Sequence, residues 1–209
     1  MSPRVEGSRR RAALQAAAIA LGLAPLAWLC ARALRGDLGA NPIEEVTHAT
    51  GLAALRLLLV ALAITPSRRW LRLQWLAPLR RTFGLLAFGY ACLHLLTYVV
   101  LDQFFDWQAI VEDVAKRPYI TAGFFAFLCL SPLAATSTRA MVRRLGPRWK
   151  TLHRLAYVAA IAAVVHFLWL VKKDVREPLT YAAVLALLLA GRWPRRKARP
   201  ALAAAERAS

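Results

Sequence analysis

Acidic residues and cysteines are both scarce in this sequence. Only 11 aspartates and glutamates stand against 29 lysines and arginines, so the formal net charge is +18. The three cysteines have no spacing typical of a zinc site or a disulfide framework. The sequence also has no glycine-rich phosphate loop, no serine, histidine and aspartate arrangement suited to nucleophilic catalysis, and no evident internal repeat. These absences argue against a hydrolase, a P-loop nucleotide-binding protein and a disulfide-stabilised secreted domain.

Hydrophobic residues, in contrast, make up 59% of the 209 residues, and the mean hydropathy is +0.44. Soluble domains are far less apolar, whereas about 20 uncharged residues in a helix cross the hydrocarbon core of a bilayer. We therefore predict an all-α polytopic membrane protein, a bundle of six transmembrane helices. The predicted spans are residues 12–31, 47–65, 82–101, 118–138, 155–171 and 178–191. The last span is so short that it also fits an interfacial or buried helix.

The basic residues are concentrated in alternate connections between these spans. They gather before the first span, between the second and third, between the fourth and fifth, and after the sixth, whereas the other connections hold most of the acidic residues. By the positive-inside rule both termini then lie in the cytoplasm, and the charge requires no nucleic acid partner. We expect a basic cytoplasmic arm at 1–11, a transmembrane domain at 12–192 and a basic cytoplasmic tail at 193–209.

The start of the chain can also be interpreted as a signal peptide, because a basic segment precedes an alanine-rich apolar run. That run is longer than a typical signal core, and further spans follow it. We therefore favour an uncleaved first helix.

All four histidines lie in or at the edge of a predicted span, where ionisable side chains are costly and usually functional. From the helical rise, His94 and His166 lie roughly 10 Å and 8 Å below the same outer boundary, on different helices. His153 lies about 27 Å from that boundary, near the cytoplasmic face. The sequence therefore predicts two levels of site, with His94 facing His166 at the outer level.

Neutral imidazole is a good ligand for iron, and a haem held between two helices needs one histidine from each and small residues nearby. Small residues do flank both positions: Gly84, Ala87, Gly89 and Ala91 around His94, and Ala159, Ala160, Ala162 and Ala163 before His166. The structural alternative is that the imidazoles hydrogen-bond between closely packed helices.

His153 and His166 are thirteen residues apart, which leaves them about 140° apart around an ideal helix. Either the helix is distorted between them, or two sites approach it from different sides.

Four segments carry a resemblance to a known family: LGANPIEEVTHATG at 38–51, RRTFGLLAFGYACLHLLTYVVLDQ at 80–103, KRPYITAGFFAFLCLSPLAATST at 116–138 and WKTLHRLAYVAAIAAVVHFLWLVKKD at 149–174. In order, spacing and flanking residues they resemble the MsrQ family, the haem-binding membrane subunits of protein-methionine-sulfoxide reductase systems. That family belongs to the ferric-reductase-like transmembrane group, whose members pass electrons across a membrane through b-type haems. The terminal arms carry no such resemblance.

The resemblance implies an electron-transfer subunit in a bacterial inner membrane, and not the methionine sulfoxide reductase itself. Electrons would come from the quinone pool or a cytoplasmic flavin reductase. They would go to MsrP, a periplasmic molybdopterin enzyme that repairs methionine sulfoxide in envelope proteins. A haem b is implied at His94 and His166, and a second haem would use His153, whose partner ligand the sequence does not identify. FMN is implied by the family alone, since the sequence has no flavin-binding motif.

Arg80, Arg81, Arg56 and His48 are further candidates for cofactor contacts. Arg80 stands where the NADPH oxidases carry another histidine, and a guanidinium cannot ligate iron because it stays protonated. Arg80 and Arg81 would instead pair with haem propionates or a flavin phosphate, or simply mark the cytoplasmic side. Arg56, deep in the second span, would hold a propionate or a quinone oxygen, or extend to the interface. His48 would belong to the outer haem environment or to partner docking, or would only start a helix.

Two rival functions remain open at the level of sequence. The same haem scaffold would serve another acceptor, such as ferric iron or oxygen. A protein of a different class, a non-haem transporter, would use the histidines to relay protons. A haem absorption spectrum separates the second rival from the electron-transfer hypothesis.

Overall fold

The structure is a computed structural model that describes residues 3–192, with side chains from Arg9 onward. Helices account for every regular element in these residues, and there is no strand among them. The elements are α1 (Pro3–Arg35), α2 (Pro42–Trp70), η1 (Gln74–Leu76), α3 (Leu79–Leu96), η2 (Thr97–Asp102), α4 (Trp107–Lys116), α5 (Pro118–Ala135), α6 (Arg139–Leu145), α7 (Pro147–Leu152), α8 (Leu155–Leu170) and α9 (Arg176–Ala190).

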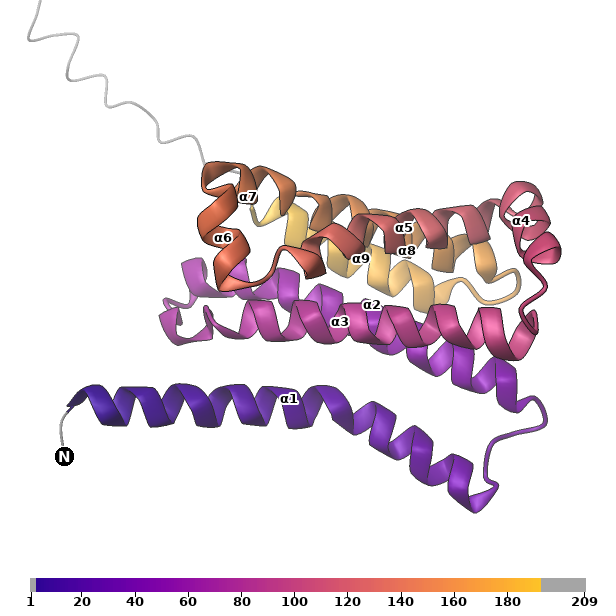
Figure 1. The fold of residues 1–209 in the computed structure, drawn as a ribbon, viewed down its shortest axis with the longest axis horizontal. Coiled ribbons are helices and arrows are strands. Elements are labelled where there is room, and N and C mark those ends of the chain that lie inside the picture. The colour runs from indigo at the N-terminus through magenta and orange to yellow at the C-terminus, as the bar shows by residue number, and fades with distance from the viewer. Residues whose placement is uncertain (1–2, 193–209) are drawn as a thin grey trace, which may run out of the picture.

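The long helices run up and down along the longest axis of the molecule (Figure 1). The start of α1, the α2–α3 connection, and helices α6 and α7 all gather at one end. The opposite end carries α4, the α1–α2 loop and the α8–α9 loop. This arrangement places the basic connections together, as the alternation of charge along the sequence predicted.

Five helical stretches are long and apolar enough to cross a membrane: Arg9–Arg35, Pro42–Trp70, Gln74–Asp102, Pro118–Ala135 and Pro147–Leu170. The protein is therefore a helical, multi-pass membrane protein, which confirms the coarse prediction. Helix α9 covers the predicted sixth span but has only 15 residues. The predicted arm at 1–11 is continuous with α1 from Pro3 onward, and the predicted tail at 193–209 lies outside the described residues.

Side-chain caps and a glycine define where several elements begin and end. Asn41 caps α2 by accepting a hydrogen bond from the Glu44 amide, with a proline at the first helical position. Asp106 caps α4 in the same way through the Ala109 amide at 3.0 Å. Gly146 has a φ of +51° and separates α6 from α7, a conformation that other residues rarely adopt. Gly146 therefore allows the sharp turn between the two short helices, α6 and α7, at the basic end of the molecule.

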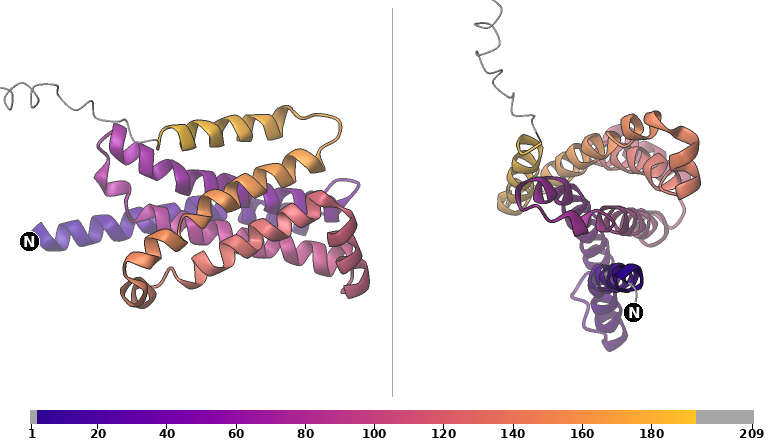
Figure 2. Two further views of the ribbon diagram at one scale, coloured as in Figure 1. Left: turned by 90° about the horizontal axis from the view of Figure 1, so that it is seen from above. Right: turned by 90° about the vertical axis from the view of Figure 1, so that its left-hand side faces the viewer.

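Helix α1 bends at Pro25, whose ring removes one backbone donor. The hydroxyl of Tyr90, on α3, enters the gap: it accepts a hydrogen bond from the Leu26 amide at 3.0 Å and donates to the Gly22 carbonyl at 2.9 Å. Seen end-on, α1 lies at one edge of the bundle (Figure 2). The Tyr90 hydroxyl therefore pairs with the backbone groups that the bend leaves without partners, and it attaches α1 to α3.

The closest helix pairings are α2 with α3 and α5 with α8. Ala87, Ala159 and Ala160 are fully buried and let these helices approach closely. At Gly84 and Gly89 of α3, in contrast, a Cβ atom would meet nothing within 4 Å. The three alanines are therefore packing positions and the two α3 glycines border open space, while the expectation that the small residues admit a haem stays a prediction.

Candidate functional site

The structure places His94, in the last turns of α3, beside His166 on α8. Their ring centroids are 6.1 Å apart, and the ring planes meet at 73°. Both side chains are partly buried between the helix pairs. The depth estimate from the sequence therefore predicted this meeting, while the role of the two residues as ligands stays a prediction.

Each ring of this histidine pair is held by a main-chain carbonyl of a neighbouring helix. Nδ1 of His94 lies 2.9 Å from the carbonyl oxygen of Thr47, and Nδ1 of His166 lies 2.6 Å from that of Tyr119. A carbonyl oxygen only accepts, so Nδ1 carries the proton in both rings and Nε2 carries the lone pair. Among the described residues, neither Nε2 has a hydrogen-bond partner. The pair thus presents two free acceptor nitrogens, the form in which imidazole binds a metal.

The chain departs from regular α-helix directly after His94. Thr97–Asp102 forms a π-helical turn, a local widening that often occurs at functional sites. The buried Thr97 hydroxyl donates to the His94 carbonyl at 2.8 Å, which ties this turn to the histidine. Sequence patterns gave no sign of the π-helical turn or of the two carbonyls, because both depend on the register between helices.

His153 has different surroundings from the histidine pair. It follows α7 at a break before α8, so the helix is distorted between His153 and His166, one of the two alternatives that the spacing allowed. The Trp149 ring stacks on it with centroids 3.9 Å apart. Its Nε2 lies 3.3 Å from the Thr136 hydroxyl, which itself donates to the Pro132 carbonyl at 2.6 Å. The hydroxyl hydrogen is used, so Thr136 accepts from Nε2–H of His153, and the proton is on the opposite nitrogen from that in the pair.

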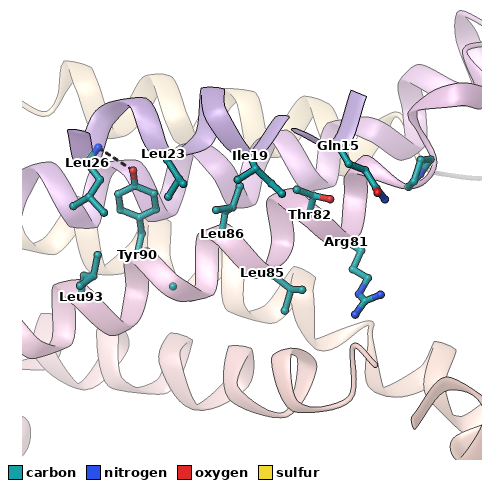
Figure 3. Close-up of a pocket in the computed structure, with 12 residues that line it drawn as sticks. Gln15, Ile19, Leu23, Leu26, Arg81, Thr82, Leu85, Leu86, Tyr90 and Leu93 are labelled. Carbon is teal, nitrogen blue, oxygen red and sulfur yellow. Dashed lines mark hydrogen bonds between the residues drawn. The ribbon is translucent and has the colours of Figure 1, made fainter. Parts of the chain in front are cut away.

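The four secondary candidates are divided among three places. Arg80 lies close enough to His153 for their charges to interact. Arg81 instead lines a cavity of about 490 Å³ between α1 and α3, near Gln15 (Figure 3). The two adjacent arginines therefore lie in different places, and only Arg80 is near the predicted inner site at His153.

Arg56 and His48 line a second, larger groove of about 870 Å³ between α1 and α2. Arg56 donates to the Tyr181 hydroxyl at 2.7 Å and lies 3.6 Å from Glu177, so it is joined to α9 while 58% of its side chain stays exposed. The ring of His48 touches the edge of Phe167, next to His166, with centroids 5.8 Å apart. Neither this groove nor the cavity beside Arg81 is lined by His94 or His166.

The sequence of the chain is similar to those of known membrane proteins. Residues 50–164 match the family described as the ferric reductase like transmembrane component. The chain therefore belongs to the class of ferric-reductase-like membrane proteins. No solved structure matches the chain.

Similar proteins within that class narrow the family further. A Rhodospirillum rubrum protein is 57% identical over 173 residues, which cover 81% of this chain and 82% of the relative. Proteins from Azospira oryzae (46% over 206 residues, covering 93% and 88%) and Caulobacter vibrioides (49% over 176 residues, covering 83% and 84%) are also similar. All three are named protein-methionine-sulfoxide reductase heme-binding subunit MsrQ. The chain belongs to the MsrQ family.

Proposed function

We propose that this protein is the membrane haem subunit of a protein-methionine-sulfoxide reductase system. In this proposal His94 and His166 hold a b-type haem near the outer face of the inner membrane. A haem supplies reversible one-electron redox chemistry, and the protein supplies ligands, orientation and burial. Electrons come from the quinone pool or a cytoplasmic flavin reductase and leave for the periplasmic molybdopterin subunit MsrP.

The observation that carries the proposal is the paired geometry of His94 and His166. Metal-binding histidines almost always donate their other ring N–H to a carbonyl or carboxylate, which fixes the tautomer and the ring direction. Both rings do this here, through Thr47 and Tyr119. Two neutral imidazoles from facing helices, with both Nε2 atoms free, are the donor set that a six-coordinate haem iron takes. The residues present therefore fit the group.

The orientation of the bundle in the membrane is part of the proposal. The end that carries α6, α7 and the α2–α3 connection is rich in arginine, so we place it in the cytoplasm with both termini. Helix α9 then crosses as the sixth span. Residues 12–192 form the transmembrane domain, and the histidine pair lies toward the periplasm.

The cytoplasmic end is the proposed side of electron uptake. His153 would hold an inner haem if its Nε2 exchanged the Thr136 hydroxyl for iron. Arg80, beside it, would balance a propionate or a flavin phosphate. FMN rests on the family resemblance.

The periplasmic end offers the proposed surface for MsrP. Phe104, Phe105 and Trp107 are exposed by 76%, 55% and 65%, beside the carboxylates of Asp102 and Asp106. Aromatic residues are enriched at the centres of protein interfaces, and the surrounding rim is polar. This surface lies directly after the helix and π-helical turn that carry His94, so it offers a short route outward from the histidine pair.

The test is an absorption spectrum of the full chain purified after expression with ample haem. We expect a b-type band that shifts on dithionite reduction. His94→Ala and His166→Ala should remove the outer haem, while Val158→Ala, at an exposed position on α8, should keep it. Reduced protein should be reoxidised by MsrP with a methionine sulfoxide substrate. A wild-type protein without haem would support a transporter instead, and reoxidation only by oxygen or ferric iron would indicate another acceptor.

A further inference from the structure

Two glycines lie directly under the rings of the histidine pair. A Cβ atom built on Gly51 of α2 would stand 2.9 Å from both Nδ1 and Cε1 of His94. A Cβ atom on Gly123 of α5 would stand 2.9 Å from Nδ1 and 3.1 Å from Cε1 of His166. Real Cβ contacts are essentially never that short, so each ring occupies space that only glycine leaves open.

The position of each glycine relative to the carbonyl that holds the ring explains why glycine is needed. Gly51 follows Thr47 by four residues, and Gly123 follows Tyr119 by four. Side chains on a helix tilt toward its N-terminus and cover the turn before them. A side chain at either glycine would therefore cover the carbonyl four residues earlier. Because glycine has no side chain, the carbonyl can accept a hydrogen bond from an imidazole of the neighbouring helix in addition to the hydrogen bond within its own helix.

The two sets are copies of one arrangement. Thr47 and Tyr119, Gly51 and Gly123, and His94 and His166 are each separated by 72 residues. In both sets the histidine lies 47 residues after the residue whose carbonyl it contacts. The pairs α2 with α3 and α5 with α8, which are also the closest helix pairings, thus present the same carbonyl, glycine and histidine geometry. One occurrence would be a packing detail, but two related by a fixed spacing indicate a shared requirement.

We propose that Gly51 and Gly123 are positioning residues for the metal ligands. They expose the Thr47 and Tyr119 carbonyls, which hold each imidazole by Nδ1–H and leave both Nε2 atoms free, with the ring centroids 6.1 Å apart. This inference rests on the proposed haem site for its purpose, while the ring contacts stand independently of it. Simple close packing is a weaker explanation, because the nearest atoms to a Cβ at either glycine all belong to a histidine ring.

The first test is a double-mutant cycle on thermal stability in detergent, which needs no haem. Alanine is the better helix former, so Gly51→Ala should raise the melting temperature unless its methyl group meets the ring. We expect Gly51→Ala to lower the melting temperature in the presence of His94 and to raise it when combined with His94→Ala. We expect the same pattern for Gly123→Ala with and without His166→Ala. Gly84→Ala and Gly89→Ala should show no coupling to either histidine. Absence of coupling would overturn the inference.

The second test measures the ligands themselves in the haem-loaded full chain. Partners that orient metal-binding histidines typically contribute about 10- to 100-fold to metal affinity, and we expect a loss of haem retention in this range for Gly51→Ala and Gly123→Ala. In protein that keeps haem, loss of the Nδ1–H bond weakens donation to iron, so the midpoint potential should rise. Retention and potential equal to those of wild type and of the Val158→Ala control would reject the positioning role. Absence of haem from wild type and controls alike would reject the proposed function, while the stability cycle would still report on the contacts.

Discussion

At the scale of single residues, the position of the ring proton distinguishes the histidines. His94 and His166 carry it on Nδ1 and leave Nε2 free, whereas His153 uses Nε2–H to donate to Thr136. The sequence predicted the meeting of the first two because helix rise converts residue number into depth. It could not predict their tautomers, because these depend on which carbonyl or hydroxyl a neighbouring helix places opposite each ring.

This difference predicts separate behaviour for the inner histidine. His153→Ala should leave the spectrum and potential of the outer haem unchanged, because His153 lies outside the paired site. Thr136→Val should remove the acceptor of Nε2–H and increase any inner haem signal relative to the outer one. Haem content per chain, measured with the two potentials, tests both variants. Loss of the outer haem on His153→Ala would contradict the two-level arrangement.

At the scale of helices, two of the prolines inside the spans, Pro25 and Pro66, are compensated by polar side chains from elsewhere in the chain. Tyr90 enters α1 at Pro25, and Pro66 leaves the Leu62 carbonyl of α2 without its usual amide partner. The Arg192 guanidinium donates to that carbonyl and also to the Tyr157 hydroxyl. A guanidinium stays protonated at neutral pH even where it is partly buried, as at Arg192. This single side chain therefore fixes the end of α9 against α2 and α8.

Replacing Arg192 should loosen α9 specifically. Arg192→Ala removes two charged hydrogen bonds at a partly buried position, and each such bond is worth about 1.5 to 3 kcal/mol of stability. We expect a lower melting temperature in detergent and faster proteolysis of α9, with Lys172→Ala, at an exposed loop position, as the control. An Arg192→Ala protein as stable as this control would show that the clamp contributes little.

At the scale of the whole molecule, the charge pattern supports the proposed orientation, and a repeat of three positions underlies the proposed site. The alternation of basic and acidic connections along the sequence was enough to predict that the helices run up and down and that the basic connections lie together at one end. The repeat escaped detection in the sequence because it consists of three positions per half, embedded in apolar segments that otherwise differ. Equal spacing of Gly51 to Gly123 and of His94 to His166 was the signal that could have revealed it.

The proposed orientation predicts which end of the bundle faces the periplasm. In a variant without native cysteines, Val111→Cys on α4 should react with a membrane-impermeant thiol reagent added to spheroplasts. Val142→Cys on α6 should react only after the membrane is opened. Both positions are exposed, by 69% and 40%. The reverse pattern of labelling would contradict the proposed topology and the proposed direction of electron flow.

The central claim is that His94 and His166 are two ligands of one iron. Low-temperature electron paramagnetic resonance of the oxidised, haem-loaded protein tests it most directly, because two imidazole ligands give a low-spin ferric signal. We predict that signal in wild type and in Val158→Ala, and its conversion to a high-spin signal or its loss in His94→Ala and His166→Ala. A low-spin signal that keeps its full wild-type intensity in either histidine variant would contradict the claim, because an inner haem at His153 would account for only part of it.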